Sequence, residues 1–177
     1  MRTIDTKHLQ DLSKANQIFQ SFKPVIESAL KGQIVDLEME SKKIYQLFDS
    51  KAGIDGVIIR NNALQSFGLR VLAFNGFHTV TFRSSRYTGT ETEYSKRLKA
   101  IESDKYLYPY LTIQVYYNKD KSLNAFSVAR TKDLIEFIRD SPSLIGQNFN
   151  SKDGNGFYFI KFSDLDLFGI PNLTKYY

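Results

Sequence analysis

The sequence contains no cysteine, and this absence excludes several kinds of site. A chain without thiols cannot form disulfides, bind a metal through thiolates or use a cysteine nucleophile. It has only two histidines, His8 and His78, and they do not form a metal-binding pair. The motifs GxxxxGK[ST], GxGxxG and GxSxG are also missing. A cofactor-dependent enzyme is therefore the least favoured class.

Long apolar runs are missing as well. No segment reaches the roughly 18 apolar residues that cross a bilayer as a helix, and the first residues lack the apolar core of a signal peptide. Hydrophobic residues nevertheless make up 42% of the chain and aromatic residues 14%, which argues against disorder. We expect a single domain over residues 1–177 that is cytoplasmic and makes no membrane contact.

The charge balance is modestly basic, with 24 lysines and arginines against 19 acidic residues and a net charge of +5. Such an excess is compatible with a polyanionic partner. An ordinary solvated surface that happens to be basic explains it equally well. No run of about five or more like charges is present, so the sequence predicts no basic tail.

The first half of the chain predicts one helix followed by strands. Apolar residues at three-four spacing indicate a helix from Leu9 to Leu30, which Pro24 should kink or split. Residues 33–49 fit either a strand or a helix. Three apolar runs then predict an antiparallel meander, with turns at Asn61-Asn62 and Asn75-Gly76. The runs cover residues 57–59, 69–74 and 79–83.

The second half predicts two further helices within a set of strands. Thr90 and Glu93 fit a capping box that begins a helix. Thr131 is a fair N-cap for a second helix that ends near Arg139, with Leu134, Ile135 and Ile138 facing inward. Strands are expected over residues 110–117, 122–129 and 157–162. This order predicts the α/β (α+β) class, with a mixed central sheet, an antiparallel meander and flanking helices.

Asp55 and Arg70 stand on neighbouring predicted strands, and their placement resembles a known motif. Asp55 directly precedes the strand at 57–59, and Arg70 lies on the next one. From about residue 6 to residue 118, the order helix, three-strand meander, helix and strand resembles the core of the PD-(D/E)XK nuclease-like superfamily. The resemblance implies a restriction-endonuclease-like core in which Asp55 binds Mg²⁺ and Arg70 fills the catalytic basic position.

The motif also departs from the family pattern. If Arg70 fills the basic position, the acidic position two residues earlier is Gly68, which has no metal ligand. Arginine stays charged and is a poor proton carrier. The acidic residues that could complete the site are not placed by spacing, and they are Glu27, Glu38, Glu40 and Asp49. Alternatively, Asp55 accepts hydrogen bonds in a turn, while Arg70 pairs with it or lies at a sheet edge.

A second cluster of polar residues surrounds the predicted start of the helix near Thr90. Helix N-termini favour phosphate, and basic, hydroxyl and aromatic side chains would add contacts to nucleic acid. The candidate nucleic-acid-binding residues are Arg83, Arg86, Tyr87, Thr90, Lys96, Arg97 and Lys99. Glu91 and Glu93 oppose this interpretation, since they suit capping, and Glu93 and Arg97 also form an ordinary i,i+4 pair.

These observations favour a nucleic-acid-binding protein with a degenerate catalytic motif. Its partner would be nucleic acid, with DNA favoured, or a nucleic-acid-handling protein complex. The composition suits a phage or mobile element, which makes a counter-defence inhibitor of a nucleoprotein nuclease a hypothesis. Two alternatives stay open: an active Mg²⁺-dependent endonuclease that uses Asp55, and a protein–protein interaction module with an aromatic sheet edge. The oligomeric state is not predicted.

Overall fold

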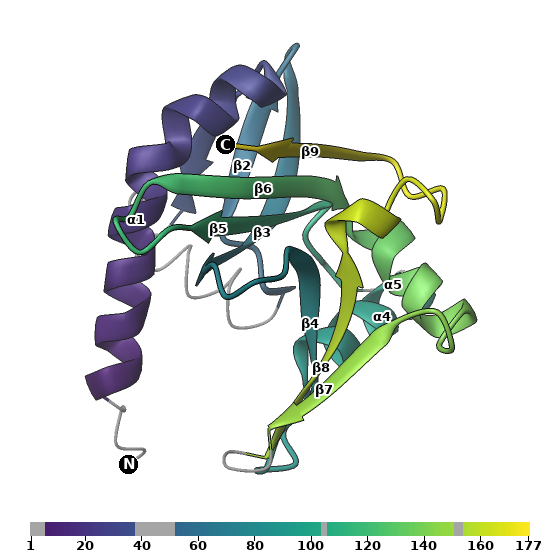
Figure 1. Cartoon of the computed structure of the whole chain (residues 1–177). Coiled ribbons are helices and arrows are strands. Elements are labelled where there is room, and N and C mark those ends of the chain that lie inside the picture. Colours follow the sequence, from purple (N-terminus) through teal and green to yellow (C-terminus); the bar gives the residue numbers. More distant parts are fainter. Residues whose placement is uncertain (1–5, 38–51, 104–105, 151–153) are drawn as a thin grey trace.

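Two β-sheets and three helices make up the described part of the protein (Figure 1), which in this computed structural model comprises residues 6–37, 52–103, 106–150 and 154–177. The helices are α1 (Thr6–Leu30), α4 (Glu93–Ser103) and α5 (Thr131–Asp140), with a 3-10 turn at Phe162–Asp164. The strands are β1 (Gln33–Asp36), β2 (Gly56–Arg60), β3 (Ala63–Ala73), β4 (Thr79–Ser85), β5 (Leu111–Tyr117), β6 (Leu123–Arg130), β7 (Gly146–Asn150), β8 (Asn155–Lys161) and β9 (Asn172–Tyr176). The predicted α+β class is confirmed.

The larger sheet has the order β1-β2-β3-β5-β6-β9 and is mixed, because β3 and β5 are parallel while all other neighbours are antiparallel. Its first hairpin forms as the sequence predicts. Asn61 and Asn62 both have positive φ, at 48° and 60°, and they join Arg60 to Ala63 in a two-residue turn. A parallel neighbour needs a long crossover, and residues 74–110 supply it.

The expected antiparallel meander is present, but its strands are β1, β2 and β3. The prediction that residues 79–83 would form its third strand is wrong, because β4 pairs with β8 in the separate sheet β4-β8-β7. The Asn75-Gly76 sequence therefore makes a loop between sheets, with Gly76 at a φ of 109°. The position beside β3 is taken by β5, whose seven residues all pair with β3 in parallel.

Two hydrophobic cores hold these layers together. The first lies between α1 and one face of the larger sheet, where Phe19 and Ile26 meet Phe67 and Ile113. Helix α1 is one continuous helix through Pro24, so the predicted split does not occur. The second core joins the smaller sheet to α4 and α5, and the predicted inward residues of α5 are buried there. Those residues are Leu134, Ile135 and Ile138.

Tyr116 connects the larger sheet to β4. It is buried on β5, and its hydroxyl donates to the Thr79 carbonyl at 3.1 Å while the Thr79 amide lies 3.3 Å from the same oxygen. His78 stacks on Phe74 beside it, with ring centroids 4.4 Å apart, and lies edge-on to Tyr176. These contacts fix β4 relative to the larger sheet, so the two sheets stand in a defined relation.

The C-terminal residues form an element that the sequence did not predict. Strand β9, Asn172–Tyr176, pairs with β6 as the edge strand of the larger sheet. Strand β7 was missed as well. The strand expected at 157–162 is β8, and it is the central strand of the smaller sheet. None of the described helices combines the length and the apolar character that spanning a membrane requires.

Two phenylalanines that differ in burial should differ in how much they contribute to the free energy of unfolding. Phe82 is fully buried on β4, whereas Phe77 is 67% exposed in the preceding loop. Phe82→Ala should lower the free energy of unfolding by about 3–5 kcal/mol, because it leaves a cavity. Phe77→Ala should change it by no more than about 0.5 kcal/mol. Urea denaturation of both variants measures this, and equal losses would contradict the placement of the core.

Candidate functional site

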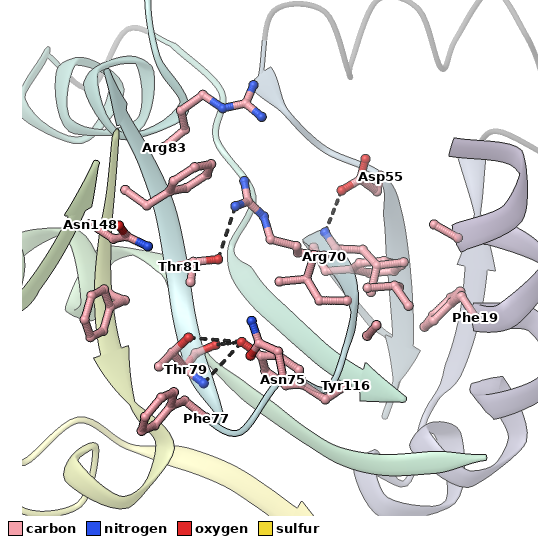
Figure 2. Close-up of a pocket in the computed structure, with 18 of the residues that line it drawn as sticks. Phe19, Asp55, Arg70, Asn75, Phe77, Thr79, Thr81, Arg83, Tyr116 and Asn148 are labelled. Carbon is pink, nitrogen blue, oxygen red and sulfur yellow. Dashed lines mark hydrogen bonds between the residues drawn. The ribbon is translucent and has the colours of Figure 1, made fainter. Parts of the chain in front are cut away.

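A cleft of about 1010 Å³ separates the C-terminal half of β3 from the smaller sheet (Figure 2). One wall is formed by α1, through Phe19, and by residues 69–73 of β3. The other wall is the face of the sheet β4-β8-β7 that carries Thr81 and Phe157. Asp55 and Arg83 lie at one end of the cleft, and Phe77 lies at the other (Figure 2).

Asp55 lies where β2 stops pairing with β3. The ladder between them ends at Gly56 and Phe67, but β3 continues to Ala73. The Asp55 amide donates to the Phe67 carbonyl at 2.9 Å, and its carboxylate accepts the Leu69 amide at 2.5 Å. The side chain thus extends the ladder by one hydrogen bond. This is the turn-like structural role that the sequence left open as an alternative.

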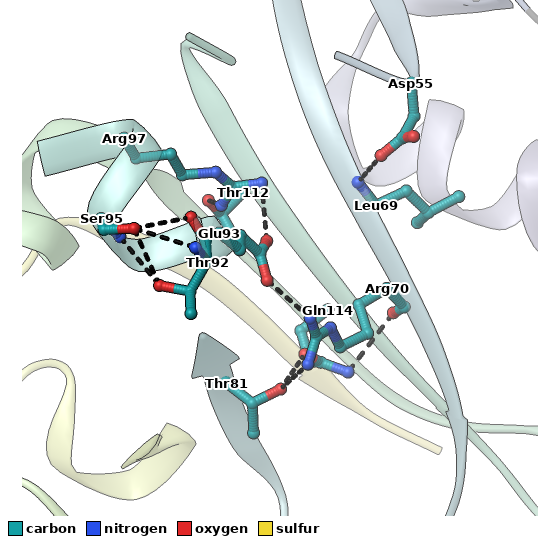
Figure 3. Close-up of polar contacts among 10 residues, drawn as sticks. All are labelled: Asp55, Leu69, Arg70, Thr81, Thr92, Glu93, Ser95, Arg97, Thr112 and Gln114. Carbon is teal, nitrogen blue, oxygen red and sulfur yellow. Dashed lines mark hydrogen bonds and ion pairs between the residues drawn. The ribbon is translucent and has the colours of Figure 1, made fainter. Parts of the chain in front are cut away.

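Arg70 points from β3 across the cleft toward the smaller sheet (Figure 3). Its guanidinium forms an ion pair with Glu93 at 2.6 Å and donates to the Thr81 hydroxyl at 3.1 Å. The same guanidinium lies 5.6 Å from the centre of the Phe157 ring. Arg70 is therefore held by groups from β4, α4 and β8.

Glu93 bridges two arginines at the start of α4. One carboxylate oxygen contacts Arg70, and the other contacts Arg97 at 2.8 Å, as the predicted i,i+4 spacing requires. Burial alone would raise the pKa of Glu93, but Arg97 and Arg70 together hold the pKa below its ordinary value of 4.5. Glu93 is therefore a fixed anion between two cations.

The cap of α4 differs from the prediction. The capping box expected between Thr90 and Glu93 is wrong, because Thr92 and Ser95 form it instead. The Ser95 amide donates to the Thr92 hydroxyl at 3.2 Å, and the Thr92 amide donates to the Ser95 hydroxyl at 2.9 Å. Since serine takes the capping role, the Glu93 side chain is available for the arginines. Thr131 likewise lies inside α5, whose N-cap is Arg130.

Arg97 is the most buried charge of this group, with only 5% of its side chain exposed. Its guanidinium donates to the Thr112 hydroxyl at 3.3 Å and lies 5.2 Å from the centre of the Phe82 ring. Burial lowers the pKa of Arg97, and Glu93 and Asp55 oppose that shift. An arginine stays protonated under these conditions. Arg97 is therefore held largely inside the fold.

Arg97 also explains Gly68, the position where the nuclease-like motif would carry its acidic residue. A Cβ atom at Gly68 would lie 2.6 Å from Arg97 Nη2 and 3.1 Å from the Gly53 carbonyl oxygen. The guanidinium thus occupies the space into which a side chain at position 68 would project. A fixed positive charge lies where the resemblance would put a metal-binding carboxylate.

Among the residues that the structure describes, those around Asp55 do not fit Mg²⁺. Both Glu93 oxygens contact arginines, and one Asp55 oxygen accepts a backbone amide. Over the described residues, no group of three histidine or acidic side chains could hold a metal. Glu27 is used elsewhere, since its carboxylate accepts the Ile34 amide at 2.7 Å. The remaining candidates, Glu38, Glu40 and Asp49, lie outside the described residues.

A second hollow of about 290 Å³ joins the basic end of the cleft. The two hollows share Asp55, Leu69, Arg70 and Arg83. Among the described residues, five basic side chains line the second hollow against two carboxylates. The basic residues are Arg70, Arg83, Arg86, Lys96 and Arg97, and the acidic ones are Asp55 and Glu93. The motif at Asp55 and the cluster near Thr90, which the sequence treated separately, thus form one site.

Three of the predicted nucleic-acid-binding residues do not line either hollow, and they are Tyr87, Thr90 and Lys99. Tyr87 is 86% exposed, and Lys99 lies over the Tyr106 ring. Sequence reasoning also missed cleft residues on β8. Phe157 and Phe159 alternate and therefore share a face of that strand. The alternation was visible, but nothing local showed that this face lies on a cleft.

The bridge through Glu93 gives a testable pH dependence. Glu93→Gln should lower the free energy of unfolding by about 1.5–3 kcal/mol at neutral pH, because it removes an ionised hydrogen-bond acceptor from two arginines. A carboxyl group whose pKa is lowered by folding contributes its full stabilisation at pH values above its pKa in the unfolded chain. It loses this stabilisation as the pH falls through its pKa in the folded protein. The difference from wild type should therefore persist above about pH 4.5 and shrink as the pH falls below it.

Denaturation curves from neutral to acidic pH measure this difference. Glu136→Gln is the matched control, because Glu136 lies 3.8 Å from the exposed Lys132, and it should cost no more than about 0.5 kcal/mol. A Glu93→Gln difference that does not change with pH would contradict the ionised bridge.

Comparison with known proteins adds no relative to this description. No protein-family model matches the chain, and no curated protein sequence matches it.

Proposed function

We propose that the protein binds nucleic acid through the basic end of the cleft and does not cleave it. The observation behind this proposal is the convergence of five basic side chains, from β3, β4, the loop after β4 and α4, on one hollow. Arginine guanidinium groups match phosphate oxygens in geometry and charge. Phosphate contacts supply most of the affinity in non-specific nucleic-acid binding.

The balance of charges supports an anionic ligand. Glu93 compensates one of the two arginines that it bridges, so this group of three keeps one positive charge. Asp55 opposes it, but Arg83, Arg86 and Lys96 line the same hollow. Arg86 is exposed, which leaves its charge accessible to a ligand. The described residues that line the hollow therefore carry a net positive charge.

The element order supports a relationship to the PD-(D/E)XK nuclease-like superfamily with a degenerate motif. Helix α1, the antiparallel strands β1 to β3, helix α4 and strand β5 follow one another as in that core, with β4 inserted. Asp55 precedes the second strand, and Arg70 lies on the third. Because Arg97 fills the space in front of Gly68, we infer that this version of the site is suited to holding a phosphate rather than to activating water.

Nucleic-acid binding should depend strongly on salt and on Arg86 and Lys96. The double variant Arg86→Gln/Lys96→Gln should weaken binding for all oligonucleotide sequences and should reduce the slope of log affinity against log salt by about 2. The control Lys119→Gln/Lys175→Gln removes the same charge from exposed positions outside both hollows. Fluorescence anisotropy at several salt concentrations measures both. Equal effects of the two double variants would show non-specific attraction and contradict the site.

Metal ions should have little effect on this site. Millimolar Mg²⁺ or Mn²⁺ should shift the melting temperature of the wild type no more than it shifts that of Asp55→Asn. Neither ion should produce cleavage of labelled DNA or RNA. The amide side chain introduced by this substitution retains an oxygen that can accept the Leu69 amide, so the variant keeps the local ladder. Metal-dependent cleavage that is lost in Asp55→Asn would contradict the proposal and identify an active endonuclease.

A further inference from the structure

One face of the smaller sheet forms a wall of the cleft and is unlike the opposite face. The opposite face carries Val80, Phe82 and Ile160, which are buried in the second core. The cleft face carries every second residue of the three strands, and these residues lie opposite one another on neighbouring strands. Arg83 and Phe157 are neighbours across one pair of strands, as are Thr81 and Phe159.

The two phenylalanines lie on β8, the central strand, and both rings are held in place. Phe157 lies between Arg83 on β4 and Asn148 on β7. Arg70 and Arg83 each lie 5.6 Å from its ring centre. This ring therefore positions two guanidinium groups at the basic end of the cleft.

Phe159 lies beside a glycine that makes room for its ring. Its partner on β7 is Gly146, and a Cβ atom there would overlap with the Phe159 ring. The ring thus covers the backbone of β7 and is fixed in orientation. Phe77, at the far end of the cleft from Arg83, is 67% exposed (Figure 2).

We propose that the cleft binds single-stranded nucleic acid, with unpaired bases stacked against Phe159 and Phe77 and with phosphates at the basic end near Arg83. This assignment rests on the proposed function and adds the kind of nucleic acid. Aromatic side chains on a sheet beside a positively charged groove are the features that bind single strands, because every base has a face for stacking. In a duplex these faces are covered by neighbouring bases.

The dimensions and charges of the cleft agree with a bound single strand of nucleic acid. Thr79 and Arg83 are four residues apart on β4, which corresponds to about 13 Å along the wall and leaves room for a few nucleotides. The charge is concentrated at one end, at Arg83 and the hollow beyond it. Phe159 and Phe77 line the cleft away from that end, together with Thr79 and Thr81. A strand lying along the cleft would thus present phosphate to the basic end and bases to the rings.

The experiment is fluorescence anisotropy with a labelled oligonucleotide of about 12 nucleotides, a length in the range that single-strand sites cover. Single-stranded DNA, single-stranded RNA and the corresponding blunt DNA duplex are compared. Wild-type protein should bind a single strand more tightly than the duplex. Phe77→Ala should weaken single-strand binding roughly 5- to 100-fold without changing its salt slope, because stacking is lost while no charge is removed.

Phe149→Ala is the matched control. Phe149 is 65% exposed and lies next to Asn148 on β7, but it does not line the cleft, so its loss should leave affinity unchanged. Phe159→Leu, with its folding checked by thermal melting, should weaken binding in the same way as Phe77→Ala. Tighter binding of either the single-stranded DNA or the single-stranded RNA than of the duplex would support the assignment. It would also show which of the two nucleic acids the cleft prefers.

Three results would overturn the inference, in two different ways. Binding of the duplex as tightly as the single strands, or affinities for Phe77→Ala equal to those for Phe149→Ala, would overturn the single-strand assignment and leave nucleic-acid binding standing. Absence of binding to every oligonucleotide at low salt would overturn both proposals.

Discussion

The bridge that Glu93 forms between Arg70 and Arg97 is the interaction on which the arrangement of this site depends. Arg70 belongs to the larger sheet, whereas Glu93 and Arg97 belong to the helix that follows the smaller sheet's first strand. Without the carboxylate, two guanidinium groups would approach each other in a partly buried space, where an unpaired charge is costly. The bridge therefore fixes the distance between the two walls at the basic end of the cleft, and the alternative cap formed by Thr92 and Ser95 is what leaves Glu93 available for it.

A fixed arginine in place of a metal ligand changes what the site can do. A divalent ion bound by two carboxylates can activate water, because it lowers the pKa of the water that it binds. A guanidinium beside a carboxylate supplies positive charge and directional donors, but it cannot exchange a proton at neutral pH. Arg97 also excludes a side chain from position 68, so one substitution there would not restore an acidic ligand without moving the arginine. In the proposed function, the described residues of this site would therefore hold a phosphate through charge and hydrogen bonds.

Sequence patterns predicted the local elements well, because helix periodicity and turn chemistry depend on neighbouring residues. Helix α1, the Asn61-Asn62 hairpin, the β5–β6 pair and the buried face of α5 are examples. The partner of β4 could not be predicted in this way, because Asn75-Gly76 suits a hairpin and an inter-sheet loop equally. The meeting of Asp55 with Arg83 and Lys96 depends on the parallel pairing of β3 with β5 and on the position of α4, which are both non-local. One local signal did exist for the site: glycine inside an apolar strand, as at Gly68, indicates close approach by another group.

The two arginines of the bridge differ in how a ligand can reach them. Arg97 is 5% exposed and also contacts Thr112 and Phe82, so its position is set by the fold. Arg70 and Glu93 are each 24% exposed, and both line the second hollow at the basic end of the cleft. An incoming phosphate would therefore meet Arg70 first and would compete with Glu93 for its donors. Because Arg97 continues to hold Glu93, the helix would keep its place while Arg70 exchanged partners, and the basic end of the cleft would stay assembled in the free and the bound protein.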